Sequence, residues 1–166
     1  GMTMLGYDGT LPVTMEDMIR HTQAVRRGSP NAFLVGDMPY MSYQPCNEDA
    51  VRNAGRFMAE ANCDAIKLEG GVAMAPRIKA IVDAGIPAIG HLGLTPQSVA
   101  ALGGFRVQGR GAAQAKQIMD DAKALEEAGA SLILLEMVPD RVTAMITEAA
   151  ENCLIMSLGS GPDAHG

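Results

Sequence analysis

The sequence contains no tryptophan and only three tyrosines and three phenylalanines among its 166 residues. It also lacks a basic run, because Lys and Arg number 13 against 19 Asp and Glu, which gives a formal net charge of −6. Proteins that bind nucleic acids use clustered positive charge, and those that bind single strands add aromatic rings on which the bases stack. A nucleic acid is therefore not an expected partner.

A long hydrophobic run is missing as well. The longest stretch without a formal charge, Ala84–Phe105, contains Pro87, Pro96, Gln97 and five glycines, which do not suit a membrane-spanning helix. The N-terminal residues 1–4 have neither the basic start nor the apolar core of a secretory signal. We therefore expect no membrane association.

Cysteine is scarce, and its spacing carries no pattern. Cys46, Cys63 and Cys153 are odd in number and far apart, so the sequence predicts neither a disulfide framework nor a cysteine metal site. Small free thiols of this kind are typical of a reducing compartment, and we expect a cytoplasmic protein. The composition, 48% hydrophobic and 19% charged, is that of a single globular domain covering residues 1–166.

Short apolar runs alternate with segments that carry helix start and stop signals. Each run is too short for a helix and suits a buried strand. The predicted strands are Ala32–Val35, Ala65–Leu68, Pro87–Ile89, Leu132–Leu135 and Leu154–Met156. The predicted helices run from Thr14 to Gly28, from Asn47 onward, from Pro76 to Ala84, from Ala112 to Ala128, and from Pro139-Asp140 onward with Val142, Met145 and Ile146 facing inward.

Strict alternation of strand and helix predicts parallel βαβ units. Both an open doubly wound sheet and a (β/α)8 barrel have this pattern, but the glycine fingerprint that usually follows the first strand of a doubly wound sheet is absent. A (β/α)8 barrel takes about 31 residues per βα unit, so this chain would hold about five units. We therefore expect the central part of a (β/α)8 barrel, with further strands before residue 1 and after residue 166.

Ionisable residues recur at the carboxyl ends of four predicted strands. Lys67 and Glu69 are two residues apart and so share one face of their strand. In a parallel barrel these strand ends meet at one mouth, which houses the active site. The residues concerned are Asp37, Lys67, Glu69, His91 and Glu136.

Two carboxylates and a lysine at such a mouth suit a hard cation and an anionic substrate, and Mg²⁺ is the expected metal. His91 could orient a substrate oxygen or satisfy backbone carbonyls. Glu136 has apolar neighbours that could raise its pKa, as a general base requires. His21 and His165 are expected to be exposed and inactive, and residues 103–111 and 159–161 are glycine-rich loops with only a weak resemblance to anion-binding loops.

Several phrases of the sequence resemble the ketopantoate hydroxymethyltransferase (3-methyl-2-oxobutanoate hydroxymethyltransferase) family. The most specific are Gly90-His91-Leu92-Gly93-Leu94-Thr95-Pro96-Gln97-Ser98 and Val107-Gln108-Gly109-Arg110. Others are Thr10–Thr14, His21–Gly28, Gly36–Pro39, Ile66–Gly71 and Leu135–Pro139, so the resemblance covers about residues 1–161.

The resemblance implies a (β/α)8 TIM barrel of the phosphoenolpyruvate/pyruvate type. It implies that Asp37 binds both Mg²⁺ and substrate, that Glu69 binds the metal, that Lys67 binds the substrate, and that Glu136 accepts a proton. The substrates would be a 2-oxo acid, 3-methyl-2-oxobutanoate, and 5,10-methylenetetrahydrofolate. The family also forms ring-shaped decamers, so a homo-oligomer is expected.

The family pattern places Gly-Asp-Ser-Leu directly before the Gly-Met that begins this sequence, and there the Asp binds the metal and the Ser contacts the substrate. Two alternatives to the transferase stay open. One is a non-catalytic barrel fragment or assembly partner, and the other is a related Mg²⁺-dependent carbon–carbon lyase acting on a different 2-oxo acid.

Overall fold

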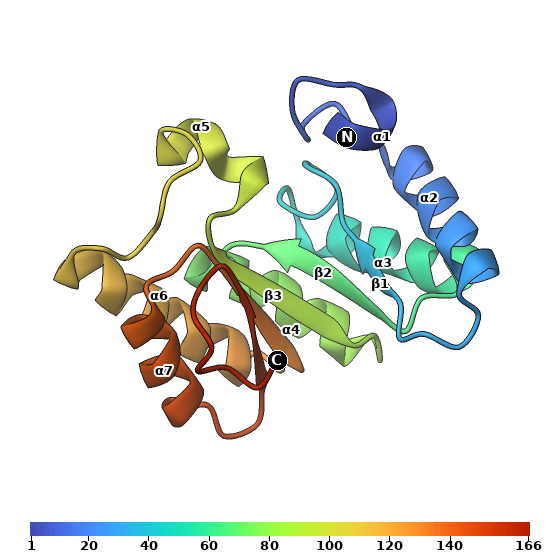
Figure 1. Cartoon of the computed structure of the whole chain (residues 1–166). Coiled ribbons are helices and arrows are strands. Elements are labelled where there is room, and N and C mark those ends of the chain that lie inside the picture. Colours follow the sequence, from blue (N-terminus) through green and yellow to red (C-terminus); the bar gives the residue numbers. More distant parts are fainter.

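The computed structural model describes residues 1–166 and contains a sheet of five parallel strands in the order β1-β2-β3-β4-β5 (Figure 1). Each strand pairs with the next one along the chain, without the reversal of order that marks a doubly wound sheet. The predicted partial barrel is confirmed, as five consecutive parallel strands joined by helical crossovers. The strands are β1 (Val35–Asp37), β2 (Ala65–Glu69), β3 (Ala88–Gly93), β4 (Leu132–Glu136) and β5 (Leu154–Leu158).

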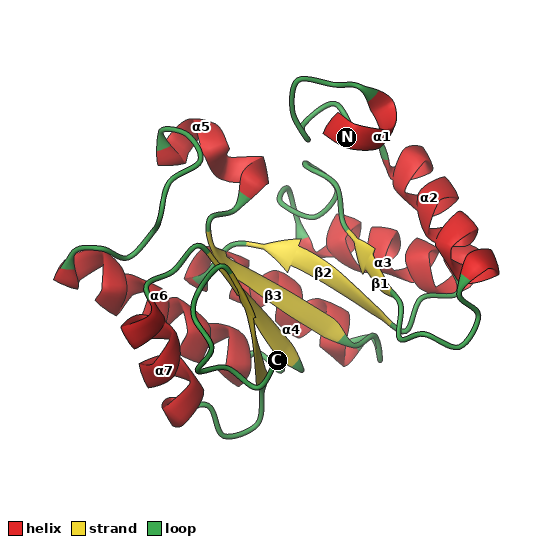
Figure 2. Cartoon of the chain, viewed as in Figure 1, coloured by secondary structure: helices red, strands yellow, loops and turns green.

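Helices connect the strands and cover the outer side of the sheet (Figure 2). The five long ones are α2 (Met15–Gly28), α3 (Asn47–Ala61), α4 (Ala75–Asp83), α6 (Ala112–Glu127) and α7 (Asp140–Ala149). Two short helices that the sequence did not predict, α1 (Met2–Leu5) and α5 (Val99–Leu102), lie at the end of the sheet where the strands finish (Figure 1). Two 3₁₀ turns, Val72–Met74 and Pro96–Ser98, follow β2 and β3.

The predicted helix signals are present as side-chain contacts. Thr14 Oγ1 accepts the Asp17 amide at 3.1 Å, and Asp17 Oδ2 in return accepts the Thr14 amide, which completes a capping box at the start of α2. Gly85 and Gly129, each two residues after the last residue of α4 or α6, adopt φ values of +83° and +96°. These two glycines end their helices in the left-handed region and turn the chain toward β3 and β4.

Two sequence predictions need correction. The first strand was predicted at Ala32–Val35 but runs from Val35 to Asp37, because the Arg26 side chain holds the Ala32 carbonyl in a turn, with an Nη1–O distance of 2.9 Å. Met145 was predicted to face inward, yet its side chain is 51% exposed. It lies one residue before the buried Ile146, on the outward side of α7.

The strand register assigns residues to the two faces of the sheet. Phe57 of α3 packs where a Cβ on Gly36 would point, and Leu125 of α6 does the same at Gly90, so both glycines face the helices. Their neighbours in each strand therefore face the opposite, inner side. The paired positions Asp37–Lys67, Glu69–His91 and Gly93–Glu136 thus all point to the inner face.

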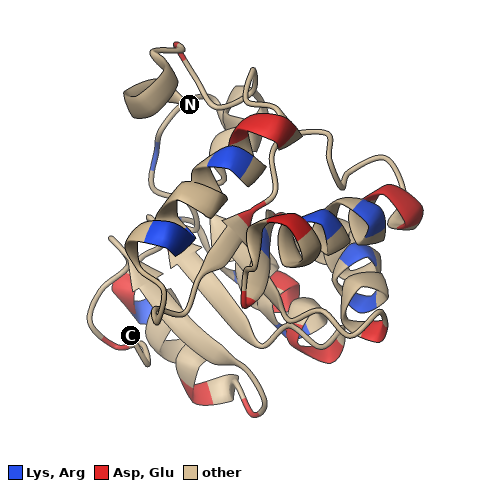
Figure 3. Cartoon of the chain, turned by 90° about the vertical axis from the view of Figure 1, so that its right-hand side faces the viewer, with Lys and Arg blue, Asp and Glu red and all other residues tan.

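The buried core lies between the sheet and the helices and is mostly aliphatic, with Phe57 and Tyr43 as its largest side chains. Lysine and arginine positions are interspersed with aspartate and glutamate positions along the helices in the view of Figure 3. None of the helices combines the length and the apolar character needed to cross a membrane. The three cysteines are free, as predicted, with Cys63 and Cys153 buried.

Candidate active site

All five predicted site residues come together on the inner face of the sheet, at the carboxyl ends of four strands. Asp37 is level with Lys67, Glu69 is level with His91, and Glu136 lies two residues higher, beside Gly93. Sequence spacing alone predicted the shared face only for Lys67 and Glu69. The roles of the five side chains remain predictions, whereas their convergence is an observation.

Lys67 lies between two other members of this group. Its Nζ is 2.7 Å from Asp37 Oδ1, and it is 3.5 Å from His91 Nδ1. The Lys67–Asp37 contact is an ion pair without the alignment of a hydrogen bond, so the buried Oδ1 atom has no aligned donor. A single ammonium group therefore serves one carboxylate and keeps capacity for a second anion.

Glu69 is almost completely buried, with its side chain 5% exposed. Loss of hydration raises the pKa of Glu69 to about 7, although the hydrogen bond from the Gln97 amide and the charge of Lys67 act in the opposite direction. The Gln97 amide donates to Oε2 at 2.9 Å, whereas Oε1 has only His91 Nδ1 near it, at 3.8 Å. One oxygen of this carboxylate is thus fixed, and the other is without a close donor.

His91 is 2% exposed, and burial together with the nearby Lys67 charge lowers its pKa to about 3. The ring is therefore neutral at physiological pH. Because Nδ1 faces the Lys67 ammonium, the proton is assigned to Nε2, which lies 3.1 Å from Glu136 Oε2. The two atoms are close but not aligned, so Nε2 is a buried polar atom without a hydrogen-bond partner.

Glu136 is the last residue of β4, and its side chain is 19% exposed. Burial raises the pKa of this carboxyl group, and the Lys67 charge opposes the shift. The main chain here is held on both sides, since the Leu94 amide donates to the Glu136 carbonyl at 2.8 Å and the Met137 amide donates to the Leu158 carbonyl at 2.9 Å. A partly buried carboxylate on a fixed backbone suits a general base.

The predicted metal ligands provide oxygen donors but not a closed cage. No group of three or more His, Cys, Asp or Glu side chains converges closely enough to hold an ion. Mg²⁺ is usually bound through one or two carboxylates and keeps several water or substrate ligands. The candidate ligands for such a site are Glu69 Oε1, which has no close donor, and Asp37 Oδ1, which has the Lys67 ammonium at 2.7 Å.

Sequence reasoning missed several residues that support the site. Tyr43 and Gln97 both contact Glu69. Gln97 belongs to one of the motifs that resemble the family, but nothing in the sequence indicated that either residue contacts Glu69. Ser160 is buried, and its hydroxyl accepts the Val138 amide and donates to the Leu135 carbonyl, both at 2.9 Å. The 159–161 turn is thus attached to the end of β4, and the Ser160 hydroxyl is already hydrogen-bonded within the protein. His165 is exposed, as expected, and its Nδ1 accepts the Ile155 amide at 3.0 Å.

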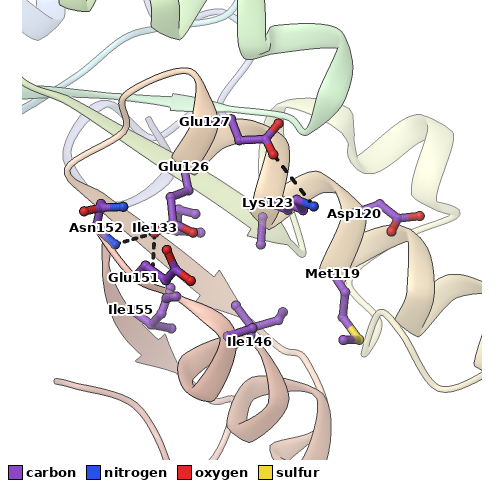
Figure 4. A pocket seen from close by; sticks show the side chains of 13 residues that line it. Met119, Asp120, Lys123, Glu126, Glu127, Ile133, Ile146, Glu151, Asn152 and Ile155 are labelled. Atoms are coloured by element: carbon purple, nitrogen blue, oxygen red, sulfur yellow. Dashed lines mark hydrogen bonds and ion pairs between the residues drawn. The ribbon is translucent and has the colours of Figure 1, made fainter.

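A cavity of about 630 Å³ lies away from this site. It lies between α6 and α7 on the outer side of the sheet, where Lys123, Glu126 and Glu151 line it (Figure 4). A smaller hollow of about 310 Å³ borders the ends of β2 and β3, where Gly70, Gly93 and Thr95 line it. The chemistry of the inner face, rather than cavity size, marks the candidate active site.

Comparison with known proteins identifies the family. The family model described as ketopantoate hydroxymethyltransferase matches residues 1–166. The chain belongs to the ketopantoate hydroxymethyltransferase family. This family member is 58% identical over 158 residues to a 3-methyl-2-oxobutanoate hydroxymethyltransferase of Pseudothermotoga lettingae, and 59% identical over 166 residues to one of Clostridium botulinum strain 657.

These matches cover 95% and 100% of the chain but 58% and 60% of the two relatives. The chain thus spans less than two thirds of the length of the curated relatives it matches. The family is thus one of hydroxymethyltransferases. The reaction of this chain itself is proposed below.

Solved structures support the fold independently. A 2,3-dimethylmalate lyase, described as a PEP mutase/isocitrate lyase superfamily member, superimposes with a TM-score of 0.66 at 16% identity, over 94% of this chain and 55% of that one. A phosphonopyruvate hydrolase in complex with oxalate and Mg²⁺ gives a TM-score of 0.58 at 14% identity, over 91% and 62% of the two chains. At such low identity these matches show the barrel architecture alone.

Proposed function

We propose that the chain transfers a hydroxymethyl group from 5,10-methylenetetrahydrofolate to 3-methyl-2-oxobutanoate, which gives 2-dehydropantoate for the synthesis of pantothenate and coenzyme A. The observation that carries this proposal is the convergence of Asp37, Lys67, Glu69, His91 and Glu136 on the inner face of the sheet, in a chain of this family. The names of the close relatives support the same reaction.

In this proposal these five side chains bind a 2-oxo acid through charge and hydrogen bonding. Lys67 pairs with the substrate carboxylate, and the neutral His91 offers its Nε2 proton to a substrate oxygen, which would satisfy a buried atom that has no aligned partner. Asp37 and Glu69 would hold Mg²⁺, and Asp37 would also contact the substrate. When bound, Mg²⁺ polarises the 2-oxo group and makes the C3 proton more acidic.

Glu136 then removes the proton from C3. Because burial raises the pKa of Glu136, its carboxylate is a stronger base than an exposed carboxylate and accepts a proton more readily. The electron pair left on C3 forms a bond to the methylene carbon of the folate as one of the two C–N bonds of that carbon breaks. Water then replaces the second nitrogen and becomes the hydroxyl group, and tetrahydrofolate leaves with the protons released from C3 and from water on its two nitrogens.

Deuterium exchange tests the first half of this reaction without folate. Exchange at C3 of 3-methyl-2-oxobutanoate in D₂O, followed by proton NMR, should require both the chain and Mg²⁺. Glu136→Gln should reduce the exchange rate by about 10²–10⁴-fold, because the amide cannot accept the proton. Glu127→Gln is the matched control, since Glu127 is exposed on α6 and paired only with Lys123.

Near-normal exchange in Glu136→Gln would reject its role as the base. An absence of exchange from a folded, unsubstituted sample would favour the alternative of a non-catalytic assembly partner. Exchange without formation of 2-dehydropantoate from 5,10-methylenetetrahydrofolate would favour a lyase acting on another 2-oxo acid.

The proposal extends to assembly and location. A homo-oligomer, the ring-shaped decamer that the resemblance implies, is tested by light scattering of the purified chain. A cytoplasmic location is supported by the three free thiols, which persist in a reducing compartment.

A further inference from the structure

Gln97 connects three segments that are far apart in the sequence. It lies in the 3₁₀ turn that follows β3, and its Nε2 donates to the Met38 carbonyl, just after β1, at 2.8 Å. Its Oε1 accepts the Tyr43 hydroxyl at 2.8 Å and Gln44 Nε2 at 3.0 Å. Its backbone amide donates to Glu69 Oε2, at the end of β2, at 2.9 Å. Through its side chain and its backbone amide, Gln97 thus connects the ends of β1, β2 and β3.

Tyr43 is hydrogen-bonded to both Gln97 and Glu69. The ring is completely buried, and its hydroxyl accepts the Glu69 amide at 3.0 Å while donating to Gln97 Oε1. The Glu69 carbonyl is also near, at 3.3 Å, but a phenol has one proton and the Gln97 contact is the shorter. Tyr43 therefore fixes the main chain of Glu69 and the side chain of Gln97 together.

The consequence is that the two oxygens of Glu69 are not equivalent. Oε2 is fixed by the Gln97 amide, whereas Oε1 has only the more distant His91 Nδ1 beside it, on the inner face. A carboxylate held in this way cannot rotate freely about its terminal bond. Only one of its oxygens is available to a cation.

We propose that Gln97 is a positioning residue that fixes Glu69 Oε2, so that Oε1 is the oxygen offered to the metal, and that Tyr43 locks Gln97 in place. The inference rests on the metal-binding role assigned to Glu69 under the proposed function. Groups that orient a metal ligand typically change metal affinity by about 10–100-fold when they are removed.

The direct test is the affinity of the chain for Mn²⁺, which replaces Mg²⁺ and is followed by the EPR signal of the free ion. Tyr43→Phe and Gln97→Met should each raise the Mn²⁺ dissociation constant by about tenfold or more. Gln23→Met is the matched control, because Gln23 makes a single side-chain hydrogen bond, to the Glu60 carbonyl, between α2 and α3. Its dissociation constant should equal that of the unsubstituted chain.

Deuterium exchange separates positioning from a general folding defect. In both variants the Mg²⁺ concentration for half-maximal exchange should rise about tenfold, while the rate at saturating Mg²⁺ should fall much less. A folding defect would instead lower the saturating rate and leave the half-maximal concentration unchanged. If Gln97→Met does not fold, Tyr43→Phe decides alone, because it removes only a hydroxyl group.

An unchanged Mn²⁺ dissociation constant in Tyr43→Phe would overturn the inference, and so would an absence of Mn²⁺ binding by the unsubstituted chain. Weaker Mn²⁺ binding in the variants, together with no exchange by the unsubstituted chain, would uphold the inference and reject the proposed reaction. The two failures are therefore distinguishable.

Discussion

At the scale of single residues, the close approach of β3 and β4 depends on Gly93. Its φ of +88° belongs to the left-handed region, and a Cβ at this position would collide with the Glu136 carbonyl oxygen and the Val138 side chain. The adjacent Leu94 amide donates to that same carbonyl. Glycine is therefore required here both for its backbone conformation and for the space it leaves beside Glu136.

Gly93→Ala should lower the free energy of unfolding by about 2–4 kcal/mol, because strain and a backbone clash act together. It should also slow deuterium exchange by displacing the end of β4. Urea denaturation measures the first effect. Gly55→Ala in α3 is the matched control, since a Cβ there meets nothing within 4 Å, and it should stabilise the chain by about 0.5–1 kcal/mol. Equal stability of Gly93→Ala and the unsubstituted chain would contradict this account.

At the scale of elements, Arg26 in the last turn of α2 sets where β1 begins. Its guanidinium donates to the carbonyls of Pro30, Ala32 and Asn62 at 2.9–3.1 Å and pairs with Asp64 Oδ2 at 2.6 Å. Asp64 Oδ2 in turn accepts the Leu34 amide at 2.7 Å. These contacts hold residues 32–34, which precede Val35, in a turn between α2 and the sheet.

Arg26→Ala should lower the free energy of unfolding by about 2–3 kcal/mol, since it removes a mostly buried guanidinium and leaves several carbonyls without donors. The control is Arg52→Ala, because Arg52 is 66% exposed and pairs only with Asp49 on the same helix. That change should alter stability by no more than about 0.5 kcal/mol. Thermal or urea unfolding of the two variants compares them directly, and equal losses would argue against an anchoring role for Arg26.

At the scale of the whole molecule, two buried groups give the folding stability opposite dependences on pH. The pKa of Glu69 is raised from 4.5 to about 7, so the folded state binds the additional proton and stability falls as the pH rises through this window. The pKa of His91 is lowered from 6.5 to about 3, so the unfolded state binds the additional proton and stability rises with pH between these values. Between pH 4.5 and 6.5 the two slopes oppose each other.

Urea denaturation in EDTA at several pH values should therefore show a weak dependence on pH between 4.5 and 6.5 for the unsubstituted chain. In Glu69→Gln the opposing slope is removed, and stability should rise with pH over this window by up to about 1.4 kcal/mol per unit relative to the unsubstituted chain. The raised pKa of Glu136 is present in both proteins and cancels in the comparison. Parallel pH profiles would show that Glu69 is ionised in the folded state throughout.

The sequence by itself determined the alternation of strands and helices, the start of α2 at its capping box, and the placement of Lys67 and Glu69 on the same face of β2. These features depend on residues close together in the chain, whose spacing is visible in the sequence. The tertiary structure alone decided that β1 begins at Val35, that His91 and Glu136 lie 3.1 Å apart, and that Tyr43 and Gln97 hold Glu69. Tyr43 and Gln97 are 54 residues apart, and contacts over such separations exist only once the parallel strands have paired.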